Sequence, residues 1–196
     1  MHIDLLNLLA SFDVVDDREN ELALFRTHVP WVGSEAYLHV IYKAAAEDVL
    51  SVCARKLDMP NPVLQFLRHQ NGAVLFSGAL YIYGVVPAGR LMNRADSFSL
   101  PPFSIERANS EKLGFDLTRF LVVAGYGFDG SRVCIDRKDL RIALFPRMSD
   151  IPVASWQDFG HWLSGEITRL SVLFDCSGKR LVEGDATIPP KLNTIQ

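Results

Sequence analysis

Apolar side chains at helical spacing predict helices in the N-terminal third of the chain. Residues 3–12 carry four of them on one face: Leu5, Leu8, Leu9 and Phe12. A good helix cap, Ser34, opens a longer helical run that reaches about Leu57. Its expected buried stripe consists of Tyr37, Ile41, Ala45, Val49, Val52 and Cys53. A second short helix is predicted over residues 63–69 and ends before Asn71-Gly72, where the glycine tolerates a left-handed conformation.

Downstream of these helices the pattern predicts strands. Residues 73–76 and 79–85 form one pair, and residues 120–124, 131–136 and 141–145 form three more strands. Turns containing glycine and aspartate separate the last three. Because these connections are mostly of hairpin length, the sheet is expected to be mainly antiparallel.

Three glycines in this region match a dinucleotide-binding pattern. Gly125, Gly127 and Gly130 have the spacing G-x-G-x-x-G after an apolar run, and Asp150 follows further along the chain. A phosphate-binding loop of this kind must lead into a helix, whose free N–H groups hold the pyrophosphate. Residues 131–136 instead alternate between β-branched and polar side chains, which predicts a strand. The glycines therefore predict a hairpin and no nucleotide cofactor.

The last predicted helix begins at a capping box, Ser155-Trp-Gln-Asp158, in which aspartate replaces the usual glutamate. The side chains expected to point inward from it are Phe159, Trp162, Leu163, Ile167, Leu170 and Phe174. Together, the elements predict an α+β fold: a central, mainly antiparallel sheet of about five or six strands with helices packed against it.

This fold divides the chain into three predicted parts. Residues 1–43 form an N-terminal helical extension that is packed on the domain or continuous with it. Residues 44–176 form the α+β domain, and residues 177–196 form an irregular tail containing glycine and proline. The longest loop covers residues 87–104, and loops of such length are often functional.

Composition narrows the class of protein. With 48% hydrophobic and 22% charged residues, the chain can bury a substantial core, and no apolar run is long enough to cross a membrane. Three widely spaced cysteines and an N-terminus without signal-peptide features favour reduced thiols and a cytoplasmic location. A formal net charge of −3 does not suggest nucleic acid as the main partner. The oligomeric state is left open.

Candidate catalytic and metal-binding groups are sparse in the sequence. No serine lies in a G-x-S-x-G motif, no two histidines have helical ligand spacing, and no C-x-x-C motif occurs. Cys134 shares a strand face with Arg132 and Asp136, but no histidine is placed beside it by sequence. The sequence therefore shows no candidate active site, although a site assembled from distant residues stays open, and no metal or cofactor is expected.

Two charged stretches are candidate partner surfaces. The first is an acidic segment that contains Asp13, Asp16, Asp17, Glu19 and Glu21. It is either a solvated loop between helices or an acidic face for a basic protein. The second is the long loop, where Arg90 and Arg94 form either a binding edge or a solvated surface.

The order of several short motifs points to a known family. It runs through Met59-Pro60, Phe66-Leu67, Asn71-Gly72, the run from Leu75 to Gly84, a short helix ending at Asn109, and Ser155-Trp-Gln-Asp158-Phe159. In this order the motifs resemble the SUKH superfamily, over roughly residues 44–174. Met59 stands where the family usually has leucine, and residues 1–40 lie outside the pattern.

The resemblance implies an α+β protein-binding domain that is not an enzyme. The bacterial members are mostly immunity proteins, which bind and neutralise a cognate toxin, often a nuclease. We therefore expect an immunity protein with a protein partner and with no nucleic acid or membrane as partner. The alternative is a regulatory or scaffold adaptor of the fungal cell-wall synthesis regulator type, and a hydrolase with an unrecognised site is less favoured.

Overall fold

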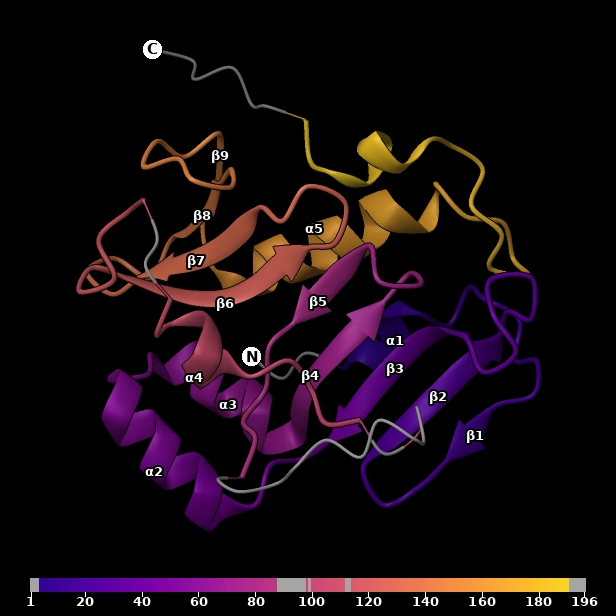
Figure 1. The fold of residues 1–196 in the computed structure, drawn as a ribbon, viewed down its shortest axis with the longest axis horizontal. Helices are drawn as coiled ribbons and strands as arrows, with labels where there is room; N and C mark the ends of the chain where they lie inside the picture. The colour runs from indigo at the N-terminus through magenta and orange to yellow at the C-terminus, as the bar shows by residue number, and fades with distance from the viewer. Residues whose placement is uncertain (1–3, 88–97, 99, 112–113, 191–196) are drawn as a thin grey trace.

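The computed structural model describes residues 4–87, 98, 100–111 and 114–190, and this part of the chain forms one nine-stranded sheet with five α-helices (Figure 1). The strands are β1 (Arg18–Glu19), β2 (Ala23–His28), β3 (Tyr37–Lys43), β4 (Gln70–Leu75), β5 (Leu80–Ile82), β6 (Phe120–Tyr126), β7 (Arg132–Asp136), β8 (Ile142–Phe145) and β9 (Ala154–Trp156). The helices are α1 (Leu5–Leu8), α2 (Glu47–Leu57), α3 (Asn61–His69), α4 (Ile105–Ala108) and α5 (Phe159–Ser171), followed by a 3-10 turn over Gly184–Thr187.

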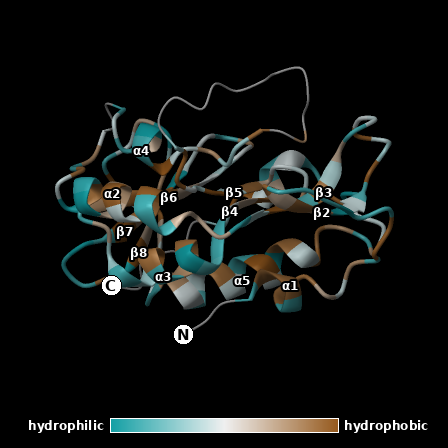
Figure 2. Ribbon diagram, turned by 90° about the horizontal axis from the view of Figure 1, so that it is seen from below, coloured by the Kyte–Doolittle hydropathy of each residue, from teal (hydrophilic) through white to brown (hydrophobic). Residues whose placement is uncertain are grey.

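The strands lie side by side in the order in which they occur in the chain, and each neighbouring pair is antiparallel. Helices α2 and α3 connect β3 to β4, and α4 lies in the connection between β5 and β6. Seen along the sheet, α1, α3 and α5 lie on one side and α4 on the other (Figure 2). No helix of the described part is long and apolar enough to cross a membrane.

The main core lies between the sheet and the layer of α1, α3 and α5. Its largest fully buried side chains include Trp162 from α5, Leu67 from α3 and Leu5 from α1. They pack against strand residues such as Leu75 and Leu80. Burial of this apolar surface is the main driving force for folding, at roughly 25 cal/mol per Å².

A smaller apolar cluster forms a second packed region beside the sheet. Ala23, Phe25 and Tyr42 from β2 and β3 pack with Phe98, and Val40 and Val74 border them. The guanidinium of Arg18 lies 3.6 Å from the centre of the Phe98 ring. Phe25 of β2 and Val40 of β3 are cross-strand partners. The sheet face that carries them is therefore also partly covered, by Phe98.

The α+β class and the antiparallel sheet are confirmed, but the predicted number of about five or six strands is too small. The predicted helix from Ser34 is wrong as far as residue 46, because Tyr37–Lys43 is strand β3 and the helix begins at Glu47. Both faces of β3 are buried, so its apolar residues do not alternate with polar ones, and periodicity cannot separate such a strand from a helix. Cys53 is buried as predicted, whereas Val52 is 57% exposed.

The capping-box prediction is displaced by three residues. Ser155 lies in β9 opposite Ala143 and does not cap a helix. Asp158 is the N-cap of α5, and its carboxylate accepts a hydrogen bond from the His161 backbone N–H at 2.9 Å. The predicted inward-facing residues of this helix, including Trp162, are buried.

The glycine pattern forms a hairpin, as predicted. Strand β6 turns back into β7, with Gly125 opposite Arg132 in the ladder. A β-carbon at Gly125 would lie 2.5 Å from the Tyr83 hydroxyl oxygen, and one at Gly127 would lie 2.1 Å from the Gly78 carbonyl oxygen. Gly130 has a φ of +73°, which the turn requires. Gly125 and Gly127 therefore make room for neighbouring groups of the sheet, and Gly130 permits the turn.

Two asparagines of the family-like pattern replace missing strand neighbours. The side-chain amide of Asn109, at the end of α4, donates to the Val122 carbonyl at 2.8 Å and accepts from the Val122 N–H at 2.9 Å. Asn71 makes the same pair of bonds with Val85. Both side chains thus satisfy backbone groups that would otherwise lack a partner.

Candidate functional site

The predicted acidic segment lies at one edge of the sheet, where it includes the edge strand β1 (Figure 1). All five of its carboxylates belong to exposed residues. Two of them are engaged within the chain: Asp17 accepts from Arg26 at 3.0 Å and from the Thr27 N–H at 2.9 Å, and Glu19 pairs with Lys43 at 2.7 Å.

The other three carboxylates of the segment have no basic partner among the described residues. Asp16 and Glu21 make neither an ion pair nor a hydrogen bond there, and Asp16 sits in a left-handed turn with a φ of 49°. Asp13 lies beside the exposed thiol of Cys176 and, by hydrogen bonding to it, raises the pKa of that thiol. The acidic segment therefore presents unneutralised negative charge at the sheet edge.

A pocket of about 190 Å³ opens at the Glu21 end of this segment. Its walls come from the residues just before β2, the end of β3, the β3–α2 connection, α2, β4 and the two ends of the long loop. The lining residues are Glu21, Leu22, Tyr42, Lys43, Ala44, Ala45, Ala46, Val49, Asn71, Val85, Pro87, Pro101 and Pro102. The structure thus brings Glu21 of the acidic segment next to the flanks of the long loop; Arg90 and Arg94 lie outside the described residues.

Tyr42 is the polar group that distinguishes this pocket. The residue is only 6% exposed, and its hydroxyl, which is not one of the fully buried unpartnered polar atoms, makes no hydrogen bond to a described residue. Burial, and to a lesser degree the nearby Tyr81, raises the pKa of Tyr42 to about 12. At neutral pH its hydroxyl is therefore a neutral group that can both donate and accept.

The size and lining of the pocket limit what it can hold. Small-molecule sites typically enclose roughly 300–1,000 Å³, so this pocket is smaller than a cofactor site. Most lining side chains are apolar, and the charged ones, Glu21 and Lys43, are exposed. In the described part of the chain no group of three His, Cys, Asp or Glu side chains could hold a metal ion. The pocket suits one large amphipathic side chain.

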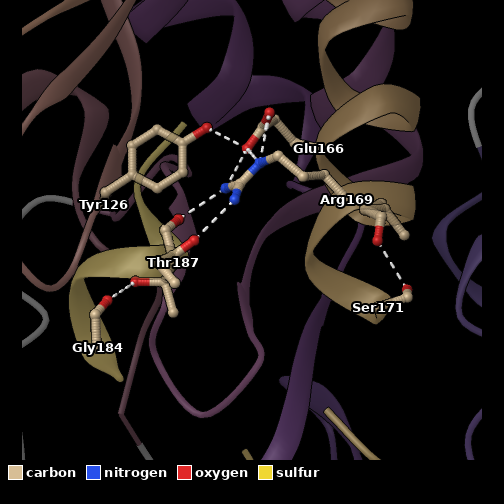
Figure 3. Close-up of polar contacts among 8 residues, drawn as sticks. Tyr126, Glu166, Arg169, Ser171, Gly184 and Thr187 are labelled. Atoms are coloured by element: carbon tan, nitrogen blue, oxygen red, sulfur yellow. Dashed lines mark hydrogen bonds and ion pairs between the residues drawn. The ribbon is translucent and has the colours of Figure 1, made fainter. Parts of the chain in front are cut away.

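A second polar cluster lies in the interior, around Glu166 of α5 (Figure 3). The buried Glu166 carboxylate accepts from the Tyr126 hydroxyl at 2.7 Å and from Arg169 at 2.8 Å. Arg169 also donates to the carbonyls of Ala186 and Thr187, at 3.0 and 2.7 Å. Burial and the Glu166 charge raise the pKa of Tyr126 well above its ordinary value. Because these groups hold one another, the cluster fastens the C-terminal segment to α5.

The thiol of Cys134, considered above as a nucleophile, lies in the core. The residue is fully buried in β7, and burial raises the pKa of its thiol well above the ordinary value. Arg132 lowers that pKa, but its effect is smaller than that of burial. A thiolate is the reactive form, so the structure gives Cys134 no activation.

Sequence reasoning found Glu21 but missed the other polar group of the pocket. Tyr42 lies within the wrongly predicted helix and outside its expected buried stripe, so the sequence did not mark it as a site residue. The pocket is lined by chain segments that lie far apart in the sequence, so no local sequence pattern predicts it. Comparison with family models, curated proteins and solved structures found no match for this chain.

Proposed function

We propose that this protein is a non-enzymatic protein-binding domain of the immunity type, which binds and neutralises a cognate bacterial toxin. The observation that carries the proposal is the acidic segment at the sheet edge, with unneutralised carboxylates at Asp16 and Glu21 and an open pocket beside it. The resemblance to the SUKH superfamily supports the same role. Two residues of the matching motifs, Asn71 and Asn109, stabilise the sheet through side-chain hydrogen bonds to its backbone.

An acidic edge fits a basic partner on physical grounds. Proteins that bind nucleic acid, nucleases among them, carry clusters of Lys and Arg where the phosphates lie. A complementary negative surface speeds the encounter and discriminates against other partners. A stable inhibitory complex typically buries about 1,600 Å², so the acidic segment and the pocket would be part of a larger contact.

The direct test is co-expression with the adjacent reading frame in a cell that the neighbour's product kills. We expect survival and a stable complex of the two purified proteins. A demonstrably toxic neighbour that kills despite co-expression would eliminate the immunity role.

Charge variants then test the surface. Asp16→Asn combined with Glu21→Gln removes two charges that make no internal contact, so the melting temperature should stay within about 2 °C of wild type. The association rate at low salt should fall by about tenfold, because steering depends on these charges. The matched control, Asp150→Asn with Glu183→Gln, removes equal charge from exposed residues outside the segment. Equal effects of both pairs would mean that net charge, and not this edge, guides the partner.

A further inference from the structure

We propose that the pocket beside Glu21 is an anchor site for one aromatic side chain, tyrosine or tryptophan, presented with basic neighbours on a loop of the protein partner. This inference rests on the proposed protein-binding function and names the chemistry that its surface recognises. The relevant site is the pocket of about 190 Å³ whose lining is given above.

The walls of the pocket favour a flat apolar body. Pro87, Pro101 and Pro102 line it together with Val49 and Leu22. A volume of about 190 Å³ accepts a large side chain but is small for a typical ligand. Interfaces concentrate their binding energy in a few large side chains seated in such desolvated pockets, with Trp, Tyr and Arg the most frequent.

The polar groups of the pocket determine which of Trp, Tyr and Arg fits it best. The amide of Asn71 is occupied by Val85, and the ammonium of Lys43 is occupied by Glu19. The Tyr42 hydroxyl makes no hydrogen bond within the described chain and is therefore available to a ligand. A tyrosine O–H or tryptophan N–H can bond to it while the ring contacts the apolar walls.

Arginine fits this arrangement less well. A desolvated guanidinium needs a carboxylate partner, and Glu21, the acidic residue of the lining, is exposed. Glu21 is instead placed to attract a Lys or Arg next to the anchor residue in the partner's sequence. The expected recognition element is therefore an aromatic residue flanked by basic ones.

The test uses three short peptides titrated into the ¹⁵N-labelled full chain. They are acetyl-Lys-Trp-Lys-amide, acetyl-Lys-Ala-Lys-amide and acetyl-Glu-Trp-Glu-amide. We expect millimolar binding of the first, with amide shifts concentrated in Ala44, Ala45, Ala46 and Val49, and at least about tenfold weaker binding of the other two. Equal binding of the tryptophan and alanine peptides would overturn the proposal.

Variants of the pocket make the test specific. Ala44→Phe fills the pocket from an exposed position and should abolish the shifts, whereas Ala10→Phe, an equal change at an exposed position outside the lining, should leave them unchanged. Tyr42→Phe should weaken binding about fivefold without lowering the melting temperature, because its hydroxyl bonds to nothing in the described chain. Unchanged binding in Ala44→Phe would refute the anchor site.

The two proposals fail in different ways. If the neighbouring toxin is neutralised and Ala44→Phe binds it as tightly as wild type, the anchor site is wrong and the immunity function stands. If no toxin is neutralised but the tryptophan peptide still binds and Ala44→Phe blocks it, the anchor site stands and the immunity function is wrong.

Discussion

The side chain of Asn71 and the backbone of Val85 are joined by two hydrogen bonds, as two paired strand residues would be. The Asn71 amide donates to the Val85 carbonyl at 2.9 Å, and the Val85 N–H donates to the Asn71 side-chain oxygen at 2.7 Å. Gly84 permits this contact, since a β-carbon there would lie 2.2 Å from the Asn71 backbone oxygen. The strand pair β4–β5 is thereby extended beyond its last ladder bond.

Replacing Asn71 by alanine should therefore destabilise the protein by about 2–3 kcal/mol, because two partly buried backbone groups lose their partner. Urea unfolding measures the loss. The matched control is Asn61→Ala on the exposed side of α3, which should change stability by less than about 0.5 kcal/mol. A similar loss of stability in both variants would mean that the change in helix or strand propensity, and not the two hydrogen bonds of Asn71, explains the loss.

The glycines of the β6–β7 hairpin allow a test by size. Gly125→Ala should cost about 2 kcal/mol, because the new β-carbon meets the Tyr83 hydroxyl at 2.5 Å. Tyr83→Phe removes that oxygen, so the double variant should be more stable than the sum of the two single losses predicts. Gly165→Ala in α5, where the β-carbon would touch nothing within 4 Å, should instead stabilise by about 0.5–1 kcal/mol. Additive losses in the double variant would contradict the steric explanation.

The Glu166–Arg169 pair should show strong coupling. Arg169→Met leaves the Glu166 carboxylate buried without its cation and should cost about 3–5 kcal/mol. Adding Glu166→Gln should recover part of this loss, as a double-mutant cycle would show. In Arg169→Met, amide exchange over Gly184–Thr187 should also accelerate, because the two carbonyl contacts of Arg169 are lost. Unaltered exchange there would mean that other contacts hold the segment.

Acid should destabilise the fold through His39. The residue is 1% exposed, and burial, assisted by the charge of Arg26, lowers its pKa to about 3. In the unfolded chain histidine has a pKa of about 6.5, so below that pH the unfolded state binds a proton that the folded state does not. The contribution of His39 is therefore complete above pH 6.5 and is lost progressively as the pH falls toward 3.

Between pH 7 and pH 5 the free energy of unfolding should drop by about 2 kcal/mol from this group alone. His39→Asn can still offer an acceptor to the Phe76 N–H, which bonds to the His39 ring at 3.3 Å. This variant will have lower stability at pH 7 because it loses ring contacts with Phe12 and Phe76, but its stability should depend less on pH. An equally steep dependence in the variant would show that another group is responsible.

The hairpins and the last helix could be predicted because their signals are local. Alternating β-branched residues around Val133 and the glycine turn at Gly130 define β6 and β7, and the apolar stripe that contains Trp162 identifies α5. Strand β3 could not be recognised in this way. It is covered on both faces, and Tyr37 and Ile41 happen to lie four residues apart, as on a helix.

The candidate site was predictable only in part. Glu21 was identified through its charge, which is visible in the sequence. The proximity of Glu21 to Tyr42 and Pro102 depends on how β2, β3 and the loop ends pack together. Neither composition nor a local sequence pattern predicts that packing. The ion pair between Asp17 and Arg26 could likewise not be predicted, because it depends on the register between β1 and β2.

A sheet whose strands pair only with their neighbours in the chain has a consequence for synthesis. Each strand after β1 finds its partner already present when it leaves the ribosome, so the sheet can grow from β1 toward β9. The loops to close are short except for the helical connection from β3 to β4 and the long connection from β5 to β6. The helical cover of the sheet is different, because α1 near the start contacts α5 near the end. The nascent chain therefore leaves the apolar sheet face that α5 covers exposed until this helix emerges, and such exposed surface favours aggregation.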